Sequence, residues 1–373
     1  MASLPNYIIV ITSLTVGGAE HQALQYALAI KRLAIGNPII VSMGSTGLLT
    51  KQLEDLEISY TTYDTQQFFG LSRFRKIITL FGFARFIRAL KPHTIIAFTH
   101  WPNLICGSIW RTTGANRFFW NQRSVDSDIA VTLWERLAIF ARPKYLSNGQ
   151  AGLNFIANRH RLQNDDVQII PNAVLVPPIS KISASSKEQS VLNIIMVANF
   201  FPEKDYATLL QAIRNYLNRE NSRKIMAHFI GSAPGNSPAL LNMKALAFEL
   251  QLENHVTFHD KKESINSFLL AADIGILSTR SEGVSNAILE YMAYGLPVIA
   301  TDILANREAL GSQNEKWLYP VENAEELANM LETLISSKER MALGQVNREY
   351  VIRRHSLKVF EQRLEEVLIT KIR

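Results

Sequence analysis

The chain has 373 residues, of which 47% are hydrophobic and 19% are charged, and its formal net charge is +6 at pH 7. This length suffices for two domains with full cores, and the composition is that of an ordinary globular protein. The single cysteine, Cys106, excludes an internal disulfide and a cysteine-based zinc cluster, and it fits a reducing cytoplasm. No apolar run is long enough to cross a bilayer.

The basic surplus suits nucleic acid, anionic lipid headgroups or polyanionic substrates as partners. We find no nucleic-acid-binding motif and expect no nucleic-acid partner. Part of the surplus lies in the segment 68–91, where basic residues are interleaved with phenylalanines. This segment is either an amphipathic helix that covers a sheet with its basic residues in solvent, or a basic-aromatic helix on a membrane surface. An excess of exposed aromatic side chains would decide for the membrane.

The first half alternates between expected strands and helices. The apolar run 7–16 has no basic residue before it, so we expect a first strand over 6–14 rather than a signal peptide. Gly17 and Gly18 then make a tight turn into a helix, where backbone N–H groups can face an anion, although two glycines after a strand often make only a turn. Later strands are expected at 38–43, 58–63, 94–98, 117–121, 145–148 and 167–173.

Three polar features follow the strands of this half. His100 ends the strand 94–98, where it is either a ligand-facing residue or a structural one whose ring packs against a neighbouring tryptophan. Arg123 follows the strand 117–121, and its guanidinium could engage a phosphate or an acidic acceptor. Asp126 and Asp128 could hold a divalent cation, but they directly precede an expected helix, so we expect them to cap it and expect no metal.

The segment 180–190 is serine-rich and has no aromatic residue, which indicates an exposed linker. After it the α/β pattern restarts. Strands are expected at 191–198, 227–232, 256–259, 273–278 and 297–301, and helices at 206–217, 265–271, 286–294, 327–335 and 346–373.

The stretch 281–300 carries the most specific chemistry. A polar loop with Gly283 leads from a strand into a helix that Ser285 or Asn286 can cap, so free N–H groups gather at the helix start and favour an anion. Glu282 and Glu290 flank that site. Because carboxylates bind sugar hydroxyls better than phosphates, the pattern indicates a nucleotide-sugar, with its diphosphate at the helix start. The alternative is two solvated surface glutamates.

The residues of 282–302 closely resemble the signature of family-4 retaining glycosyltransferases with the GT-B fold. The resemblance implies that Glu282 contacts the donor sugar, that Glu290 holds the ribose hydroxyls, and that the loop between them offers backbone amides. Lys204 matches the lysine of the family's donor-phosphate loop, and Gly17 and Gly18 match its Gly-Gly-Ala-Glu loop, which faces the interdomain cleft.

The chain also departs from the family pattern. Asn199 and Phe201 stand where relatives carry an arginine, and we expect Arg280 or Arg307 to supply that charge. Arg123 stands near the place of the family's histidine. Leu304 and Ala305 replace a pair of glycines.

The expected site residues follow from these matches. Catalytic roles are expected for Glu282 and Lys204, and donor-binding roles for Asn199, Arg280, Gly283, Val284, Ser285, Asn286 and Glu290. On the acceptor side of the cleft, we expect Gly17, Gly18, His100 and Arg123.

We therefore expect an α/β protein with the GT-B fold, in which two Rossmann-like domains turn their parallel sheets toward an interdomain cleft. The expected divisions are an acceptor-side domain over 1–173, a linker over 174–190, a nucleotide-sugar domain over 191–345 and a C-terminal helix over 346–373 that packs back toward the first domain.

The expected function is that of a retaining, metal-independent glycosyltransferase of the hexosyltransferase type. It would move a sugar from a nucleotide-sugar, with UDP favoured, to a glycan or lipid-linked glycan acceptor in cell-surface polysaccharide synthesis, by family analogy. No cofactor is expected, and the protein would be cytoplasmic, with peripheral contact with the anionic inner face of the membrane left open. The alternatives are a sugar-nucleotide epimerase of the same fold and a non-catalytic nucleotide-sugar-binding protein.

Overall fold

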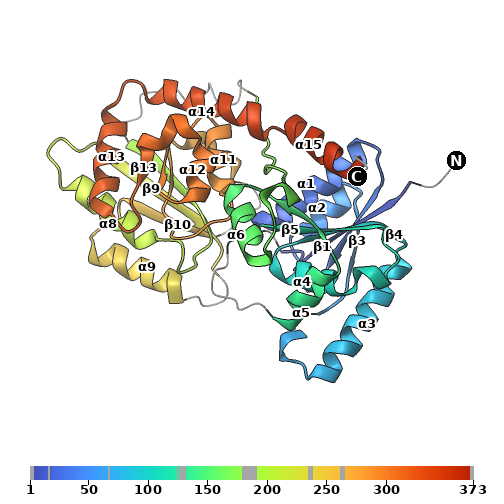
Figure 1. Cartoon of the computed structure of the whole chain (residues 1–373). Helices are drawn as coiled ribbons and strands as arrows, with labels where there is room; N and C mark the ends of the chain where they lie inside the picture. Colours follow the sequence, from blue (N-terminus) through green and yellow to red (C-terminus); the bar gives the residue numbers. More distant parts are fainter. Residues whose placement is uncertain are drawn as a thin grey trace. The chain divides into compact units, whose positions relative to one another are not determined.

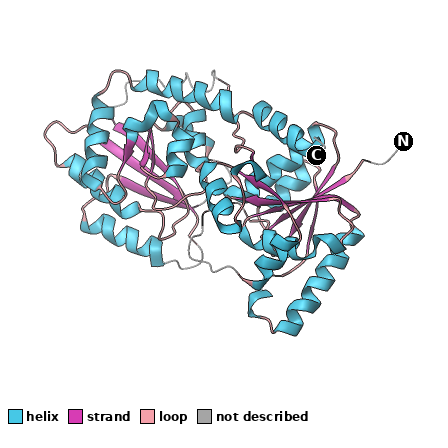
Figure 2. Ribbon diagram, in the orientation of Figure 1, coloured by secondary structure: helices cyan, strands magenta, loops and turns pink. Residues whose placement is uncertain are grey.

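The structure, a computed structural model, describes residues 4–15, 17–65, 68–123, 125, 132–178, 191–233, 238–260 and 265–369. The chain divides into two compact units, of which the first contains residues 1–173 and 358–373 and the second contains residues 174–357. Each unit is a parallel sheet covered by helices (Figures 1 and 2). The serine-rich segment 180–190, Asp126 and Asp128 lie outside the described residues.

The first unit contains a parallel sheet in the order β3-β2-β1-β4-β5-β6-β7. Its apolar residues are buried on both faces, as in β1, where Ile8 and Val10 join the core on one side and Ile9 is buried on the other. All seven predicted strands are confirmed. They are β1 Asn6–Ile11, β2 Asn37–Ser42, β3 Ser59–Thr62, β4 Pro92–Phe98, β5 Arg117–Gln122, β6 Lys144–Ser147 and β7 Val167–Ile169.

Helices cover both faces of this sheet (Figure 1). Helices α3 to α6 contribute to the core on one face. On the other face Tyr26 of α1 packs against Phe98 of β4 and Phe360 of α15, with ring centroids 5.0 and 5.2 Å apart. The helical segments are α1 Gly18–Arg32, α2 Leu49–Asp55, η1 Phe68–Gly70, α3 Arg73–Ala89, α4 His100–Ile109, η2 Trp110–Thr112, α5 Leu133–Phe140, α6 Gln150–His160, η3 Asn164–Asp166 and α15 Leu357–Ile369.

The second unit repeats this architecture with a parallel sheet in the order β10-β9-β8-β11-β12-β13. Its strands are β8 Val191–Val197, β9 Lys224–Gly231, β10 Val256–Asp260, β11 Ile274–Leu277, β12 Val298–Thr301 and β13 Leu318–Tyr319. Its helices are α8 Tyr206–Leu217, α9 Pro238–Glu249, α10 Asn266–Ala271, α11 Asn286–Ala293, α12 Leu304–Leu310, η5 Ser312–Trp317, α13 Ala324–Ser336 and α14 Arg340–His355.

The sequence predicts most of these elements but not all of them. Helix α8 has its predicted bounds, and α11 ends beside Gly295, whose φ of +73° suits glycine. Strand β13 and helices α9 and α12 were not predicted. The prediction of a single helix over 346–373 is wrong. The backbone is extended at Ser356, which separates two helices, α14 and α15. Within the described ranges no helix combines the length and apolar character that a bilayer crossing requires.

Candidate functional site

The two central strands of the second sheet mark the place where a ligand is expected. From β8 the chain runs outward to β9 and β10, and it then returns to β11 on the other side of β8. Open parallel α/β sheets bind ligands at the carboxyl ends of the strands beside such a reversal. The loops that follow β8 and β11 therefore define the candidate site.

An ion pair joins these two loops. The Lys204 ammonium, on the loop after β8, donates to Oε1 of Glu282, on the loop after β11. The two side chains are only 14% and 19% exposed, so the pair is largely shielded from water but remains reachable. The structure thus brings together the two residues that were expected to be catalytic.

Backbone hydrogen bonds fasten the same loops to each other. The Asp205 N–H donates to the Ser278 carbonyl at 3.0 Å, and the Arg280 N–H donates to the Glu203 carbonyl at 2.9 Å. The Thr279 hydroxyl adds a third bond, also to the Glu203 carbonyl, at 3.1 Å. These bonds fix the two loops that carry Lys204 and Glu282. The sequence motif of residues 282–302 does not indicate them.

The Arg280 side chain, on the loop after β11, contacts the loop after β8. Its guanidinium donates to the Pro202 carbonyl at 2.8 Å and forms ion pairs with Glu322 at 2.6 Å and with Asp205 at 3.4 Å. The hydrogen bond to Glu322 raises the pKa of Arg280. Arg307, the other expected source of positive charge, is paired with a carboxylate on the loop after β12. In this structure both arginines therefore have acidic partners.

Helix α11 begins just after Glu282. The Ser285 hydroxyl accepts a hydrogen bond from the Ile288 N–H at 3.3 Å, so the predicted cap is confirmed. Gly283 and Val284 link the ion pair to the helix, and the first turn supplies backbone N–H groups at the positive end of the helix dipole. This arrangement suits a ligand with a negative charge.

Glu290 lies farther along α11 and has an unusual carboxyl group. The residue is partly exposed, and desolvation of its carboxyl by the surrounding protein raises its pKa to about 7. Across the described parts of the chain, no hydrogen bond or ion pair to this carboxylate is found. A partly buried carboxylate without a partner can accept hydrogen bonds from the hydroxyl groups of a ligand.

The carboxyl end of β8 is held by a neighbouring strand and by two tyrosines. The Asn199 side-chain oxygen accepts from the N–H and hydroxyl of Ser232, at 3.1 and 2.9 Å, which leaves its amide nitrogen for a ligand. The Tyr206 hydroxyl donates to the Ala198 carbonyl, and the Tyr291 hydroxyl accepts from the Val197 N–H. These tyrosines were not predicted.

Two glycines make this packing possible. A Cβ on Gly231 would lie 1.9 Å from the carbonyl oxygen of Ala198. The end of β9 can therefore approach the loop after β8 only because residue 231 is a glycine. A Cβ on Gly275 would lie 2.5 Å from the Tyr291 ring. A glycine inside an apolar strand signals such a close approach, and Gly275 could have revealed the Tyr291 contact.

The first unit has a corresponding reversal between β1 and β4. The Thr12 and Thr99 hydroxyls, which follow these strands, lie 3.2 Å apart. Thr99 has φ 69° and ψ 170°, a backbone region that is essentially restricted to glycine. Backbone strain of this kind concentrates at functional sites, and no sequence pattern predicts it at a threonine.

The four acceptor-side residues have different surroundings within the first unit. Gly17 precedes α1, where a Cβ would meet the Glu20 carboxylate at 2.3 Å, and Gly18 begins that helix. His100 begins α4 and packs against Trp120 of β5, with ring centroids 6.4 Å apart, whereas Trp101 packs against Phe68.

Arg123 lies inside the first unit instead of on its surface. It is only 8% exposed, its guanidinium lies 5.5 Å from the Phe98 ring centre, and it donates to the Asn172 side chain. Burial lowers its pKa to about 10. The predicted contact between this guanidinium and an acceptor therefore requires a movement of the side chain.

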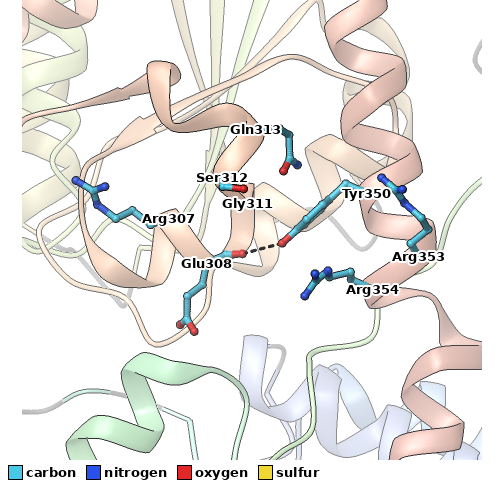
Figure 3. A pocket seen from close by; sticks show the side chains of 8 residues that line it. All are labelled: Arg307, Glu308, Gly311, Ser312, Gln313, Tyr350, Arg353 and Arg354. Carbon is cyan, nitrogen blue, oxygen red and sulfur yellow. Dashed lines mark hydrogen bonds between the residues drawn. The ribbon is translucent and has the colours of Figure 1, made fainter.

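A separate open pocket of about 630 Å³ lies on the second unit (Figure 3). Three arginines, Arg307, Arg353 and Arg354, line it together with Tyr350, whose hydroxyl donates to the Glu308 carbonyl at 3.2 Å. The pocket does not contain Lys204, Glu282 or Glu290, so it is distinct from the candidate site. Within the described ranges, no group of three or more His, Cys, Asp or Glu side chains could hold a metal ion.

Comparisons with known proteins agree with this geometry. Residues 179–350 match the family of glycosyl transferases group 1. An uncharacterized glycosyltransferase of Haemophilus influenzae is 29% identical over 99 residues, which cover 26% of this chain and 28% of that protein. The N-acetyl-alpha-D-glucosaminyl L-malate synthase of Bacillus anthracis is 23% identical over 203 residues, which cover 54% of this chain and 48% of that protein. The chain thus spans less than half the length of these curated relatives.

The whole chain also resembles a solved structure. Anabaena HepE, in complex with UDP and glucose, superimposes with a TM-score of 0.81 at 17% identity, over 97% of this chain and 98% of that one. At this identity the likeness shows the fold alone. Residues 179–350 of the chain thus match the glycosyl transferases group 1 family, and its two parallel α/β units have the GT-B fold.

Proposed function

We propose that the protein is a retaining, metal-independent glycosyltransferase that moves a hexosyl group from a UDP-sugar to a glycan or lipid-linked glycan. The observation that carries the proposal is the Lys204–Glu282 pair at the reversal of the second sheet, beside the start of α11. UDP and glucose in the HepE structure support the choice of donor. The names of the relatives support the reaction class.

Each group at the site has a role in this proposal. The leaving diphosphate accepts hydrogen bonds from the first turn of α11 and from the Lys204 ammonium, which leaves Glu282 when the donor binds. Glu282 is then free to accept hydrogen bonds from the sugar hydroxyls, and Glu290 does the same for the ribose. Lys204 thus exchanges one anionic partner for another, and Glu282 exchanges the ammonium for the hydroxyl donors of the sugar.

The transfer step uses few side chains. The bond between the anomeric carbon and the diphosphate oxygen breaks, and an acceptor hydroxyl forms the new bond on the same face of the sugar. The leaving phosphate oxygen takes the proton of that hydroxyl. This route needs no acid–base pair of carboxylates, and it predicts a product with the anomeric configuration of the donor.

A UDP-release assay with a set of UDP-sugars and a bacterial lipid-linked glycan extract tests the proposal. We expect acceptor-dependent release that Lys204→Ala and Glu282→Gln each lower at least about tenfold, whereas the surface variants Lys338→Ala and Glu339→Gln of the same unit retain it. Conversion of the donor in the absence of any acceptor would instead identify an epimerase. UDP binding without turnover on the extract would identify a non-catalytic binding protein.

We also propose that the protein works at the cytoplasmic face of the membrane, because a lipid-linked acceptor would be presented there. The net charge of +6 supports attraction to anionic lipid.

A further inference from the structure

Helix α3 has two apolar faces, and only one of them packs into the protein. The inner face joins the core of the first unit through Leu80, Phe83, Ala84 and Ile87. The second face is open to solvent, with exposed fractions of 72% for Phe74, 58% for Ile77, 54% for Ile78 and 73% for Phe81. These four residues are spaced i, i+3, i+4 and i+7, so they form one continuous stripe along the helix.

Two positively charged residues lie on the same face of α3, beyond the apolar stripe. Arg85 and Arg88 follow Phe74 by eleven and fourteen positions, which places them on the helix face of the apolar stripe, and both are exposed. Neither has a carboxylate partner among the described residues. The whole segment 68–91 contains no aspartate or glutamate. We call this series of four apolar and two basic residues the α3 stripe.

Apolar surface continues next to the start of α3. Phe68 of η1, just before α3, packs against Trp134 of α5, with ring centroids 5.7 Å apart. Helix α5 in turn exposes Leu137 and Phe140. Figure 1 shows α5 beside the segment that leads into α3. Phe68 is itself buried, so the exposed apolar stripe of α3 is the feature that marks an interaction site.

We propose that the α3 stripe docks the protein on the surface of a membrane that contains anionic lipid. Phe74, Ile77, Ile78 and Phe81 enter the boundary between headgroups and acyl chains, and Arg85 and Arg88 bind lipid phosphates. Charge complementarity favours a membrane as the partner. The helix combines cations and large apolar side chains without any acidic residue, which matches anionic headgroups above acyl chains. The proposal rests on α3 itself and does not depend on the transfer reaction.

The proposal is tested by sedimentation of the full chain with sucrose-loaded vesicles, without nucleotide or acceptor. We expect binding to vesicles of phosphatidylglycerol and phosphatidylcholine, much weaker binding to phosphatidylcholine alone, and a decrease with salt. F74S/F81S and R85E/R88E should each reduce the partition coefficient at least about tenfold. Because all four side chains are exposed, the thermal midpoints of both variants should match the parent chain.

Helix α9 offers a matched control. Leu241 and Phe248 have the same i, i+7 spacing as Phe74 and Phe81, and are similarly exposed, at 62% and 69%. L241S/F248S should leave vesicle binding unchanged. Equal binding by all variants, or no binding of the parent chain to anionic vesicles, would overturn the proposal. Loss of a dimer in F74S/F81S, measured by sedimentation velocity, would reassign the stripe to a second copy of the chain.

Discussion

Replacing Glu290 by glutamine separates two properties of this residue, its unfavourable burial and its capacity to accept hydrogen bonds. Burial raises the pKa of its carboxyl from 4.5 to about 7. Such a rise corresponds to a free-energy penalty of about 3 kcal/mol for keeping the carboxyl ionised in the folded chain. Glutamine has nearly the same shape without the charge, so the variant lacks this penalty.

The penalty has a definite pH dependence. Between pH 4.5 and about 7, the unfolded chain has released the Glu290 proton while the folded chain still holds it. The free energy of unfolding therefore falls as pH rises through this window and levels off above it. Below the window the two proteins should be equally stable, and above it Glu290→Gln should be more stable by up to about 3 kcal/mol.

Thermal unfolding on both sides of the window measures this difference, and titration calorimetry with UDP measures the cost in binding. Charge-assisted hydrogen bonds contribute about 1.5–3 kcal/mol, so we expect UDP affinity above the window to fall roughly 10- to 100-fold in Glu290→Gln. Glu349→Gln, on the exposed surface of α14, should change neither quantity. A stability difference that is the same at both pH values would refute the burial argument, and unchanged UDP affinity would exclude Glu290 from the site.

Three other substitutions test two residues of the candidate site and one buried carboxylate of the first unit. Lys204→Ala removes the cation that we propose to bind the donor phosphates, and kcat/KM should fall roughly 10- to 100-fold. Arg280→Lys should weaken UDP binding nearly as much as Arg280→Ala, because a compact ammonium does not reproduce the fork in which Nη1 reaches the Pro202 carbonyl and Nε reaches Glu322. Glu135→Gln, which removes a buried carboxylate, should lower the free energy of unfolding by about 3 kcal/mol at neutral pH, measured by urea denaturation.

Each of these predictions has its own check. Lys338→Ala should leave kcat/KM unchanged, and the Lys204 prediction fails if both lysine variants behave alike. Full UDP affinity in Arg280→Lys would mean that charge alone suffices there. Burial alone would raise the pKa of Glu135, but hydrogen bonds from His160 and Arg159 lower it to about 2. Its stabilising effect should therefore disappear as pH falls from 4.5 toward 2, and a pH-independent effect would contradict the ion pair.

The sequence predicted the secondary-structure elements better than it predicted the side-chain contacts between residues far apart in the chain. Apolar periodicity located both sheets, and the Ser285 cap fixed the start of α11, because these features depend on neighbours along the chain. The Lys204–Glu282 pair joins residues 78 positions apart, and no local pattern indicates that their side chains meet. The inward position of Arg123 depends on a distant partner in the same way.

The two reversals of strand order are built differently, and the difference fits their proposed partners. In the second unit, hydrogen bonds between the Glu203 and Thr279 loops hold the site residues in place, which suits the proposed binding of a nucleotide-sugar. In the first unit, Thr99 keeps a backbone conformation that costs about 1–3 kcal/mol, although glycine would adopt it freely. Compared with glycine, threonine adds a Cβ, a methyl and a hydroxyl, and the hydroxyl donates to the Phe98 carbonyl and lies 3.2 Å from that of Thr12. The strained backbone therefore places a pair of hydroxyls at the strand ends, where they are available to the proposed acceptor.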